Sequence, residues 1–396
     1  MTQTTTMLRT PSSAPPAATQ TKSILFVVNC LDVGGAEIQV MRLAEGLRRR
    51  GWSVSVVSML PPALYEQLQE SGVQVYSLKM RPGVPNPAAL LRLRRIVKRI
   101  RPDMVHSHIV HANILTRLTR LIAPMRVLVC TAHNIREGGM AYNLAYRCTD
   151  WLADLTTNVS QAAVDRYVQI RAAPAERIRF VPNGLDISRF RCDPASRDRL
   201  RRELGIADQF VWLAVGRFRE QKDYPNMIRA FAASDPTHKS VLMLAGAGET
   251  QDDARRLVDS LGLSDRVRFL GVRDDTPDLL NMADAFVLSS AWEGMPLVLQ
   301  EASACALPIV ATNVGGNAEV VRDGVSGFLV PPRDDANLAG AMIRMMDMTP
   351  AGRKAMGNAG RTHVASFFDI ERVLDRWEKI YGELMGETSG QEGRCD

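Results

Sequence analysis

The sequence predicts an α/β protein with two doubly wound, parallel-sheet domains that face each other across a cleft. Short apolar runs alternate along the chain with amphipathic stretches of helical length. The same alternation starts again after a polar, proline-containing stretch at residues 191–205. The length of 396 residues is too great for one ordinary domain and suits two domains of roughly 150 to 200 residues each.

The first half opens with the apolar run at residues 23–29. Its unbroken hydrophobic character is typical of a strand that is buried on both faces of a parallel sheet. A glycine-containing loop and an amphipathic helix follow, and Gly51 ends that helix. Further strands are predicted, with helical stretches between them, at residues 54–59, 73–78, 103–108 and 126–133. The first domain is expected to span residues 23–195.

The second half repeats this pattern, and the second domain is expected to span residues 205–368. Its strands are predicted at residues 210–217, 240–248, 267–272, 284–290, 308–312 and 327–330. Helices are predicted at residues 225–233, 253–262 and 297–306. A last amphipathic helix follows at residues 370–384.

Composition restricts the class of protein and its compartment. Residues 1–22 are rich in Thr, Ser, Pro and Ala without an apolar core, so they are expected to form a disordered tail and not a signal peptide. Residues 387–396 are expected to be a loose polar tail. The six cysteines have irregular spacing and no CxxC pair, which favours a reduced cytoplasmic protein over a disulfide scaffold or zinc site. No apolar run reaches the ~20 residues that a membrane span needs.

One segment concentrates the positive charge of a chain whose net charge is +6. Residues 90–101 carry six basic residues and no acid, and their apolar positions recur at helical spacing. Such a helix can lie on an anionic membrane, together with Arg117 and Arg120, or it can be a solvated surface helix with its apolar face in the core. The first interpretation predicts a peripheral membrane protein, and a nucleic-acid partner is not expected.

Two glycine-containing turns follow predicted strands. Ligands of such sheets bind outside the carboxyl ends of the strands. Gly34 and Gly35 open the first helix, where the backbone can approach a phosphate or sugar closely, although a plain tight turn explains them equally well. Gly246 begins the turn GAGE after another strand, and this turn is either a ligand contact or structural.

A third strand end carries two cations. Gly216 and Arg217 end the strand at 210–217, and Lys222 follows five residues later. Arg and Lys at this position could hold a diphosphate and balance its charge without a metal ion. The alternative is that both are surface cations, which their place directly after an apolar strand disfavours.

The segment at residues 291–308 carries the strongest chemical signal. Glu293 and Glu301 lie eight positions apart, and a proline suited to a helix start lies between them. Glu293 could bind sugar hydroxyls, Glu301 a ribose diol, and the free N–H groups of the helix start a phosphate. The alternative is two ordinary surface glutamates, which the apolar context disfavours. The backbone donors would come from the turn between the two glutamates: Gly294, Met295, Pro296 and Leu297.

Three histidines end strands of the first half. His133 ends the strand at 126–133 and would face the cleft from the side opposite Glu293. His106 and His108 end the strand at 103–108 in the same way. A lone histidine is usually structural, and without carboxylate partners at metal spacing the three predict no zinc site.

These motifs, in this order, resemble those of the family 4 retaining glycosyltransferases of the GT-B fold, also called glycosyltransferase group 1. The resemblance runs from about residue 24 to about residue 385, and the glutamate pair with seven residues between is the family's hallmark. The matching segments are GGAE at 34–37, TAHN at 131–134, VPNGLD at 181–186, GRFREQKD at 216–223, LAGAGE at 244–249, EGMPLVLQE at 293–301, VGG at 314–316 and DGVSGFLVPP at 323–332.

The resemblance implies two Rossmann-like domains with divided tasks. The first domain would bind the acceptor, the second the nucleotide sugar, and a helix at residues 369–386 would cross back onto the first domain. Arg217 and Lys222 would hold the diphosphate, and Glu301 the ribose. Gly35 would contact the phosphate or the reacting sugar. Glu293 and the backbone of Gly294 to Leu297 would contact the donor sugar, and His133 would lie close beside that sugar.

The resemblance also implies the reaction. It would be transfer from a UDP- or GDP-sugar with retention and without a metal, by front-face attack in which the leaving diphosphate takes the acceptor proton. No DxD motif appears where a metal-dependent enzyme would carry one. A lipid-linked saccharide of bacterial polysaccharide synthesis is the acceptor we expect. The alternatives are a sugar-nucleotide epimerase of the same fold, which the motifs fit poorly, and a non-catalytic nucleotide-sugar-binding protein.

Overall fold

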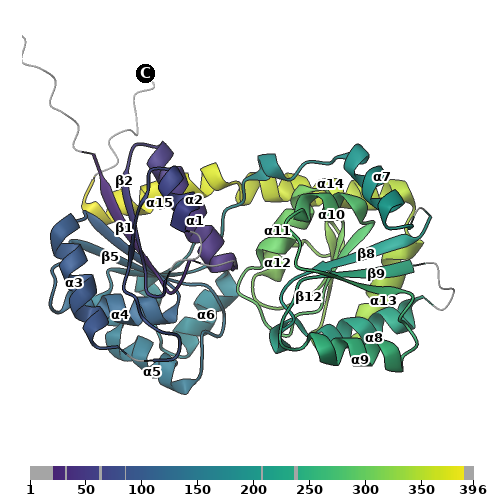
Figure 1. Ribbon diagram of the computed structural model, residues 1–396, viewed down its shortest axis with the longest axis horizontal. Coiled ribbons are helices and arrows are strands. Elements are labelled where there is room, and N and C mark those ends of the chain that lie inside the picture. The colour runs from purple at the N-terminus through teal and green to yellow at the C-terminus, as the bar shows by residue number, and fades with distance from the viewer. Residues whose placement is uncertain are drawn as a thin grey trace, which may run out of the picture.

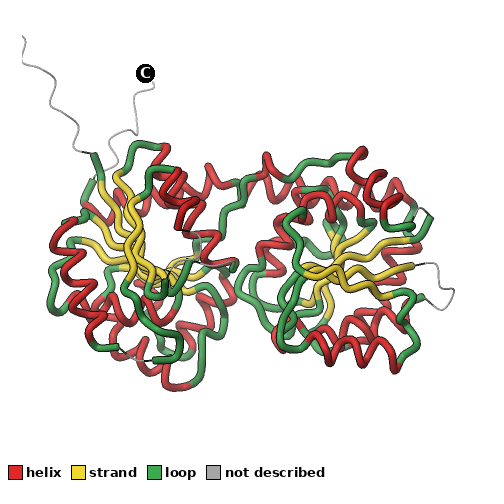
Figure 2. Tube along the Cα trace, viewed as in Figure 1, coloured by secondary structure: helices red, strands yellow, loops and turns green. Residues whose placement is uncertain are grey.

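The computed structural model describes residues 21–31, 34–61, 65–84, 86–206, 208–235 and 240–387. The predicted tails at 1–22 and 387–396 therefore lie almost wholly outside the described residues. Two α/β domains lie side by side, and the last helix, yellow in Figure 1, runs back from the second domain to the first. In each domain helices cover both faces of a central sheet (Figure 2). The predicted architecture is confirmed.

The first domain is built on a parallel sheet with the order β3-β2-β1-β4-β5-β6-β7. The strands predicted from the first half are all present, and β6 and β7 extend the sheet beyond them. The strands are β1 (Ser23–Val28), β2 (Ser53–Ser58), β3 (Gln74–Ser77), β4 (Met104–His108), β5 (Val127–Ala132), β6 (Leu155–Asn158) and β7 (Ile178–Phe180). The helices are α1 (Gly35–Arg49), α2 (Tyr65–Glu70), α3 (Ala88–Ile100), α4 (Val110–Arg120), α5 (Met140–Thr149) and α6 (Gln161–Gln169), with short 3-10 turns η1 (Asp150–Leu152) and η2 (Ala175–Arg177).

The second domain has a parallel sheet with the order β10-β9-β8-β11-β12-β13. Its strands are β8 (Phe210–Val215), β9 (Ser240–Ala245), β10 (Val267–Gly271), β11 (Ala285–Leu288), β12 (Ile309–Thr312) and β13 (Gly327–Val330). Its helices are α8 (Tyr224–Ser234), α9 (Gln251–Ser260), α10 (Thr276–Met282), α11 (Leu297–Ala304), α12 (Asn317–Val320), α13 (Asp335–Asp347) and α14 (Pro350–Phe367), with η4 (Glu220–Lys222) after β8.

The segment between the domains contains η3 (Ile187–Arg189) and α7 (Pro194–Glu203). The α7 helix lies against the second domain, because Ser196 donates a hydrogen bond of 2.6 Å to Asp278 of α10. Arg199 forms an ion pair of 2.7 Å with the same carboxylate. The connection between the domains therefore lies before α7.

The helix α15 (Ile370–Met385) completes the first domain. Val373, Leu374 and Trp377 are fully buried in the same core as the apolar side chains of β1 and α1. A Cβ on Gly46 of α1 would overlap Leu374, so the two helices pack at close range. At the rim, Arg50 forms ion pairs of 2.6 to 2.7 Å with three acids of α15. The predicted crossing helix is thus an integral part of the first domain.

Replacing Tyr381 of α15 by Phe should lower the free energy of unfolding by about 1 to 2 kcal/mol. The Tyr381 hydroxyl and the Nδ1 atom of the buried His106 form a hydrogen bond of 2.7 Å, and its loss leaves a buried polar atom without a partner. Urea denaturation measures the change. Tyr76→Phe is the matched control, because the Tyr76 hydroxyl bonds Gln74 at the surface. Equal effects of the two changes would contradict this role of Tyr381.

Candidate active site

Glu293 is the centre of a buried polar cluster at the edge of the second sheet. It follows β11, only 5% of its surface is exposed, and its Oε1 lies 2.5 Å from the Lys222 ammonium. The two meet because β8, which precedes Lys222, and β11 are neighbours in the sheet. Gln221 and Ser290 donate further hydrogen bonds of 3.0 and 2.7 Å to the same carboxylate. The carboxylate is therefore fixed in place and its charge is balanced by Lys222.

The turn after Glu293 leads into the start of α11, as the sequence predicts. Gly294, Met295 and Pro296 are buried, and the helix begins at Leu297. Asn183 of the connection between the domains donates a hydrogen bond of 3.2 Å to the Met295 carbonyl group. The turn is thus held by segments of both the second domain and the connection.

Glu301 lies one helical turn beyond Leu297 and forms an ion pair with the first domain. Its Oε1 is 3.6 Å from the guanidinium of Arg42 on α1. Arg42 also donates a hydrogen bond of 2.9 Å to the Gly184 carbonyl group. Burial raises the pKa of the Glu301 carboxyl, and the charge of Arg42 opposes that rise. A ribose at Glu301 would compete with Arg42 for this carboxylate.

The starts of α1 and α11 face each other. Gly34 precedes α1, and a Cβ on Gly35 would lie 3.8 Å from Leu297 Cδ1. The structure therefore brings together the glycine turn of the first domain and the helix start of the second. The N-termini of helices favour anionic ligands.

The loop after β5 touches the second domain through its backbone. Asn134 and Gly294 form an isolated antiparallel bridge. A Cβ on Gly294 would overlap the carbonyl oxygen of His133 and lie 2.9 Å from its carbonyl carbon. Only glycine allows this approach, so Gly294 determines how closely the two walls of the site can meet.

The His133 imidazole lies beside this contact. Its Nε2 is 2.8 Å from the Nδ1 of His108, which is close because β4 and β5 are adjacent strands. Burial lowers the pKa of His133 to about 3, so the ring is neutral at physiological pH. Its buried Nδ1 atom has no hydrogen-bond partner among the described residues. A buried polar atom without a partner is unusual in a folded protein, and it marks this ring as a candidate ligand contact.

The turns after β8 and β9 pack on each other at the same edge. Gly246 has φ of +138°, and a Cβ there would overlap the Gly216 carbonyl oxygen. A Cβ on Gly216 would lie 3.4 Å from the Cε of Lys222. Arg217 extends from this turn as an exposed residue. Lys222 and Arg217 thus come from one strand end, where both can meet an anionic group.

Several residues of this site were not predicted from sequence. Gln221 and Ser290 carry no signal of their own, although each lies within three residues of a predicted site residue. Arg42 lies on the helix that Gly35 opens, but its partner Glu301 is far away in sequence.

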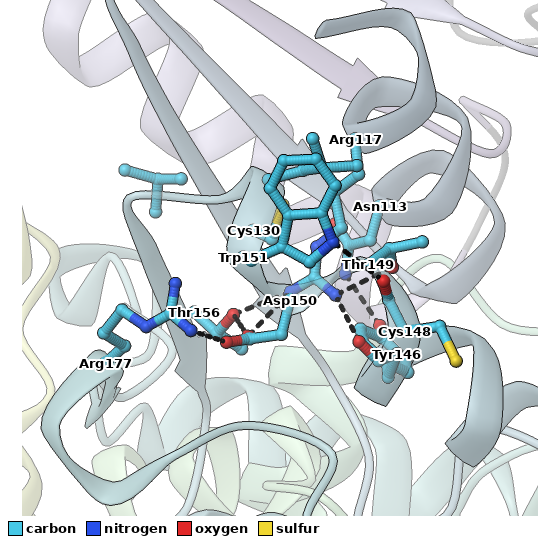
Figure 3. A network of polar contacts seen from close by, with 12 residues as sticks. Asn113, Arg117, Cys130, Tyr146, Cys148, Thr149, Asp150, Trp151, Thr156 and Arg177 are labelled. Carbon is cyan, nitrogen blue, oxygen red and sulfur yellow. Dashed lines mark hydrogen bonds and ion pairs between the residues drawn. The ribbon is translucent and has the colours of Figure 1, made fainter. Parts of the chain in front are cut away.

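One sequence prediction is wrong. Arg117 of α4, which was predicted to contribute to a membrane surface, is fully buried and contacts Asp150 and Thr156 (Figure 3).

The metal-binding side chains of the described residues are not grouped into a site. No group of three or more His, Cys, Asp or Glu side chains in the described ranges is placed to hold a metal ion. Independence of a metal stays a prediction. The cations that the arrangement does offer are Lys222 and Arg217.

Comparison with known proteins agrees with this geometry. Residues 33–189 match the model described as Glycosyltransferase Family 4, and residues 196–363 match that of Glycosyl transferases group 1. The chain is 30% identical to a D-inositol 3-phosphate glycosyltransferase of Saccharomonospora viridis, over 91% of each chain. It is 26% identical to the UDP-Gal:alpha-D-GlcNAc-diphosphoundecaprenol alpha-1,3-galactosyltransferase of Escherichia coli, over 75% of this chain and 79% of that protein.

The fold has solved counterparts as well. The crystal structure of Anabaena HepE in complex with UDP-glucose matches with a TM-score of 0.81 and 25% identity, over 91% of this chain and 99% of that one. The two family models cover both domains, and the Saccharomonospora viridis relative matches over 91% of its length. The chain therefore belongs to the family 4, group 1 glycosyltransferases of the GT-B fold.

Proposed function

We propose that this glycosyltransferase moves a sugar from a UDP-sugar to a lipid-linked saccharide of bacterial polysaccharide synthesis, with retention and without a metal ion. One observation carries the proposal. Glu293, neutralised by Lys222, lies on the same turn as Gly294, which touches the His133 loop of the first domain. A donor bound there would contact both domains at its sugar.

The choice of donor and acceptor rests on similar proteins. HepE has been crystallised with UDP-glucose, and the Escherichia coli relative is named for UDP-Gal and a diphosphoundecaprenol acceptor. A GDP-sugar is the alternative donor. In the site, Glu301 would hold the ribose once Arg42 moves aside, and Lys222 and Arg217 would hold the diphosphate.

Retention without a protein nucleophile agrees with the hydrogen bonds that Glu293 accepts. Its carboxylate receives hydrogen bonds from Lys222, Gln221 and Ser290, which reduces its strength as a nucleophile and suits it to orient sugar hydroxyl groups. Lys222 and Arg217 would stabilise the negative charge that develops on the leaving diphosphate. That diphosphate would then accept the proton of the attacking hydroxyl group.

UDP-sugars should raise the melting temperature of the protein in the presence of EDTA. A ligand at one hundred times its Kd stabilises the folded state by about 2.7 kcal/mol, and GDP- and ADP-sugars should have less effect. The anomeric configuration of the product, read by NMR, then tests retention. Protection by GDP-sugars alone would overturn the choice of base, and loss of transfer in EDTA would overturn metal independence. Formation of an epimer from donor alone would favour the epimerase.

Membrane association is a further part of this proposal. None of the helices in the described part of the chain is both long and apolar enough to cross a bilayer. Leu93 and Val97 of α3 are buried in the first domain, whereas its basic side chains Arg95, Lys98 and Arg99 are exposed. The adjoining helices supply exposed apolar side chains: Leu118, Leu121 and Ile122 on or beside α4, Met140 and Leu144 on α5, and Trp151 on η1.

Reversing the three exposed charges of α3 should weaken binding to anionic vesicles. Each basic residue near an anionic surface contributes about 1 kcal/mol, so replacing Arg95, Lys98 and Arg99 by Glu should lower the affinity roughly a hundredfold or more. Co-sedimentation with vesicles of phosphatidylcholine, with and without phosphatidylglycerol, measures it. A triple Glu variant at Arg255, Arg256 and Lys354 in the second domain changes the net charge equally. If both variants bind alike, α3 does not form the membrane surface.

A further inference from the structure

Glu137 lies in the loop between β5 and α5, the loop of the first domain that touches the second domain at Gly294. It lies four residues after His133, and its Oε1 accepts a hydrogen bond of 2.6 Å from the His133 backbone N–H. Its Oε2 accepts a second one, of 2.8 Å, from the Tyr146 hydroxyl. Glu137, which is itself partly buried, therefore ties the backbone of His133 to the buried Tyr146 of α5.

Tyr146 is itself fixed by a buried network. Its hydroxyl also accepts a hydrogen bond of 2.8 Å from Asn113 of α4, and the Arg117 guanidinium lies 5.0 Å from the centre of its ring. Arg117 in turn is held by Asp150 and by Thr156 (Figure 3). The carboxylate of Glu137 is therefore anchored to packed helices and does not move with the loop alone.

The groups that face Glu137 are mostly hydrogen-bond donors. They are the His133 N–H, the hydroxyls of Tyr146 on α5 and Tyr167 on α6, and, farther away, the charge of Arg117 on α4. Burial raises the pKa of Glu137 to about 7, and these groups oppose the rise. An ionised carboxylate accepts from all the donors, whereas a protonated one adds a hydrogen that competes with them.

The loop that Glu137 holds is the one that meets the donor-side wall. Its backbone forms the bridge between Asn134 and Gly294, and the His133 carbonyl group touches Gly294 directly. A displacement of about 1 Å at such a contact can lower a rate roughly a hundredfold. Glu137 can affect this contact through the backbone, because both of its carboxylate oxygens bond to groups of the first domain.

We propose that Glu137 is a positioning residue for sugar transfer: its ionised carboxylate fixes the backbone of His133 and Asn134, and so holds the imidazole and the Gly294 contact in place. This role rests on the proposed function of the site around Glu293. Glu137 acts through His133, and makes no contact with the reacting atoms.

The test compares Glu137→Ala, Glu137→Gln and Tyr146→Phe in the full chain. Release of UDP from UDP-glucose, UDP-galactose and UDP-N-acetylglucosamine, with water receiving the sugar, gives kcat and KM, and calorimetry with UDP gives Kd. We expect Glu137→Ala to lower kcat about a hundredfold while Kd for UDP changes less than threefold. Glu137→Gln keeps one acceptor for the His133 N–H, so its kcat should be about tenfold higher than that of Glu137→Ala.

The pH profile separates positioning from a purely structural role. The wild-type kcat should rise severalfold between pH 6 and pH 8 as Glu137 ionises, and Glu137→Gln should stay flat at the acid level. Tyr146→Phe removes a donor that lowers the pKa of Glu137, so its profile should shift to higher pH. The Gln and Phe variants decide the question if Glu137→Ala does not fold.

Three outcomes have distinct meanings. A wild-type kcat in a folded Glu137→Ala, or the wild-type pH profile in Glu137→Gln, overturns the positioning role. Glu176→Ala, which removes an exposed acid of η2, is the control and should match the wild type throughout. If calorimetry shows no binding of UDP to the wild type, the proposed donor fails, and that result is independent of Glu137.

Discussion

Replacing Lys222 by alanine is expected to lower kcat/KM by roughly a thousandfold while the fold persists. The Lys222 ammonium lies 2.5 Å from Glu293 and is placed to stabilise the charge of a leaving diphosphate. Removal of one preorganised group that stabilises developing charge typically costs 10²- to 10³-fold in rate, about 2.7 to 4 kcal/mol. Loss of its ion pair also leaves the buried Glu293 with only neutral donors. Steady-state kinetics and circular dichroism measure the two effects.

The neighbouring Arg219 provides the control for Lys222. It is exposed, belongs to the same loop and carries the same charge, so Arg219→Ala should change kcat/KM less than threefold. Wild-type turnover in Lys222→Ala would remove Lys222 from the active site. Binding of donor without any transfer by the wild type, with every acceptor tested, would favour the non-catalytic alternative.

Replacing Gly294 by alanine is expected to lower kcat about a hundredfold or more. The new Cβ would overlap the His133 carbonyl oxygen and lie 3.0 Å from the Asn134 Cα. These are backbone atoms, so the overlap can be relieved only by moving one wall of the site away from the other. Displacements of this size misalign reacting groups. The core of each domain is untouched, so each should remain folded in thermal melts.

A matched glycine elsewhere separates this effect from a general cost of adding a methyl group. Gly340 lies inside α13, and a Cβ there would have no neighbour within 4 Å. Gly340→Ala should leave kcat unchanged and stabilise the protein by about 0.4 to 1 kcal/mol. Full activity of Gly294→Ala would show that the two walls need not meet during transfer.

The fold class was predictable because most strands carry their own signal, although the short strands β6 and β7 were not predicted. Apolar runs such as residues 210–215 predict buried parallel strands, and the glycines and cations after them predict an edge where ligands bind. The pairing of Lys222 with Glu293 was not predictable, because it depends on β8 and β11 being neighbours. Strand order is set by the packing of the whole domain and leaves no local mark in the sequence.

The buried polar groups were harder to predict from the sequence. Arg117 occurs among polar residues of α4, and a charged side chain in such a helix is normally exposed. Its burial depends on Asp150, Thr156 and Tyr146, which come from separate elements. Glu137 is comparable, because a glutamate in a loop between Arg136 and Gly138 looks solvent-exposed until the folded chain surrounds it with tyrosines.

The position of α15 has a consequence for how the protein is made. The first domain lacks Leu374, Trp377 and other side chains of its core until residues 370–385 have been synthesised. Domains usually fold in order as the ribosome releases them, but here the entire second domain is translated between β7 and α15. The first domain therefore keeps an open apolar face until α15 has been synthesised, and its core closes only after the second domain has been translated.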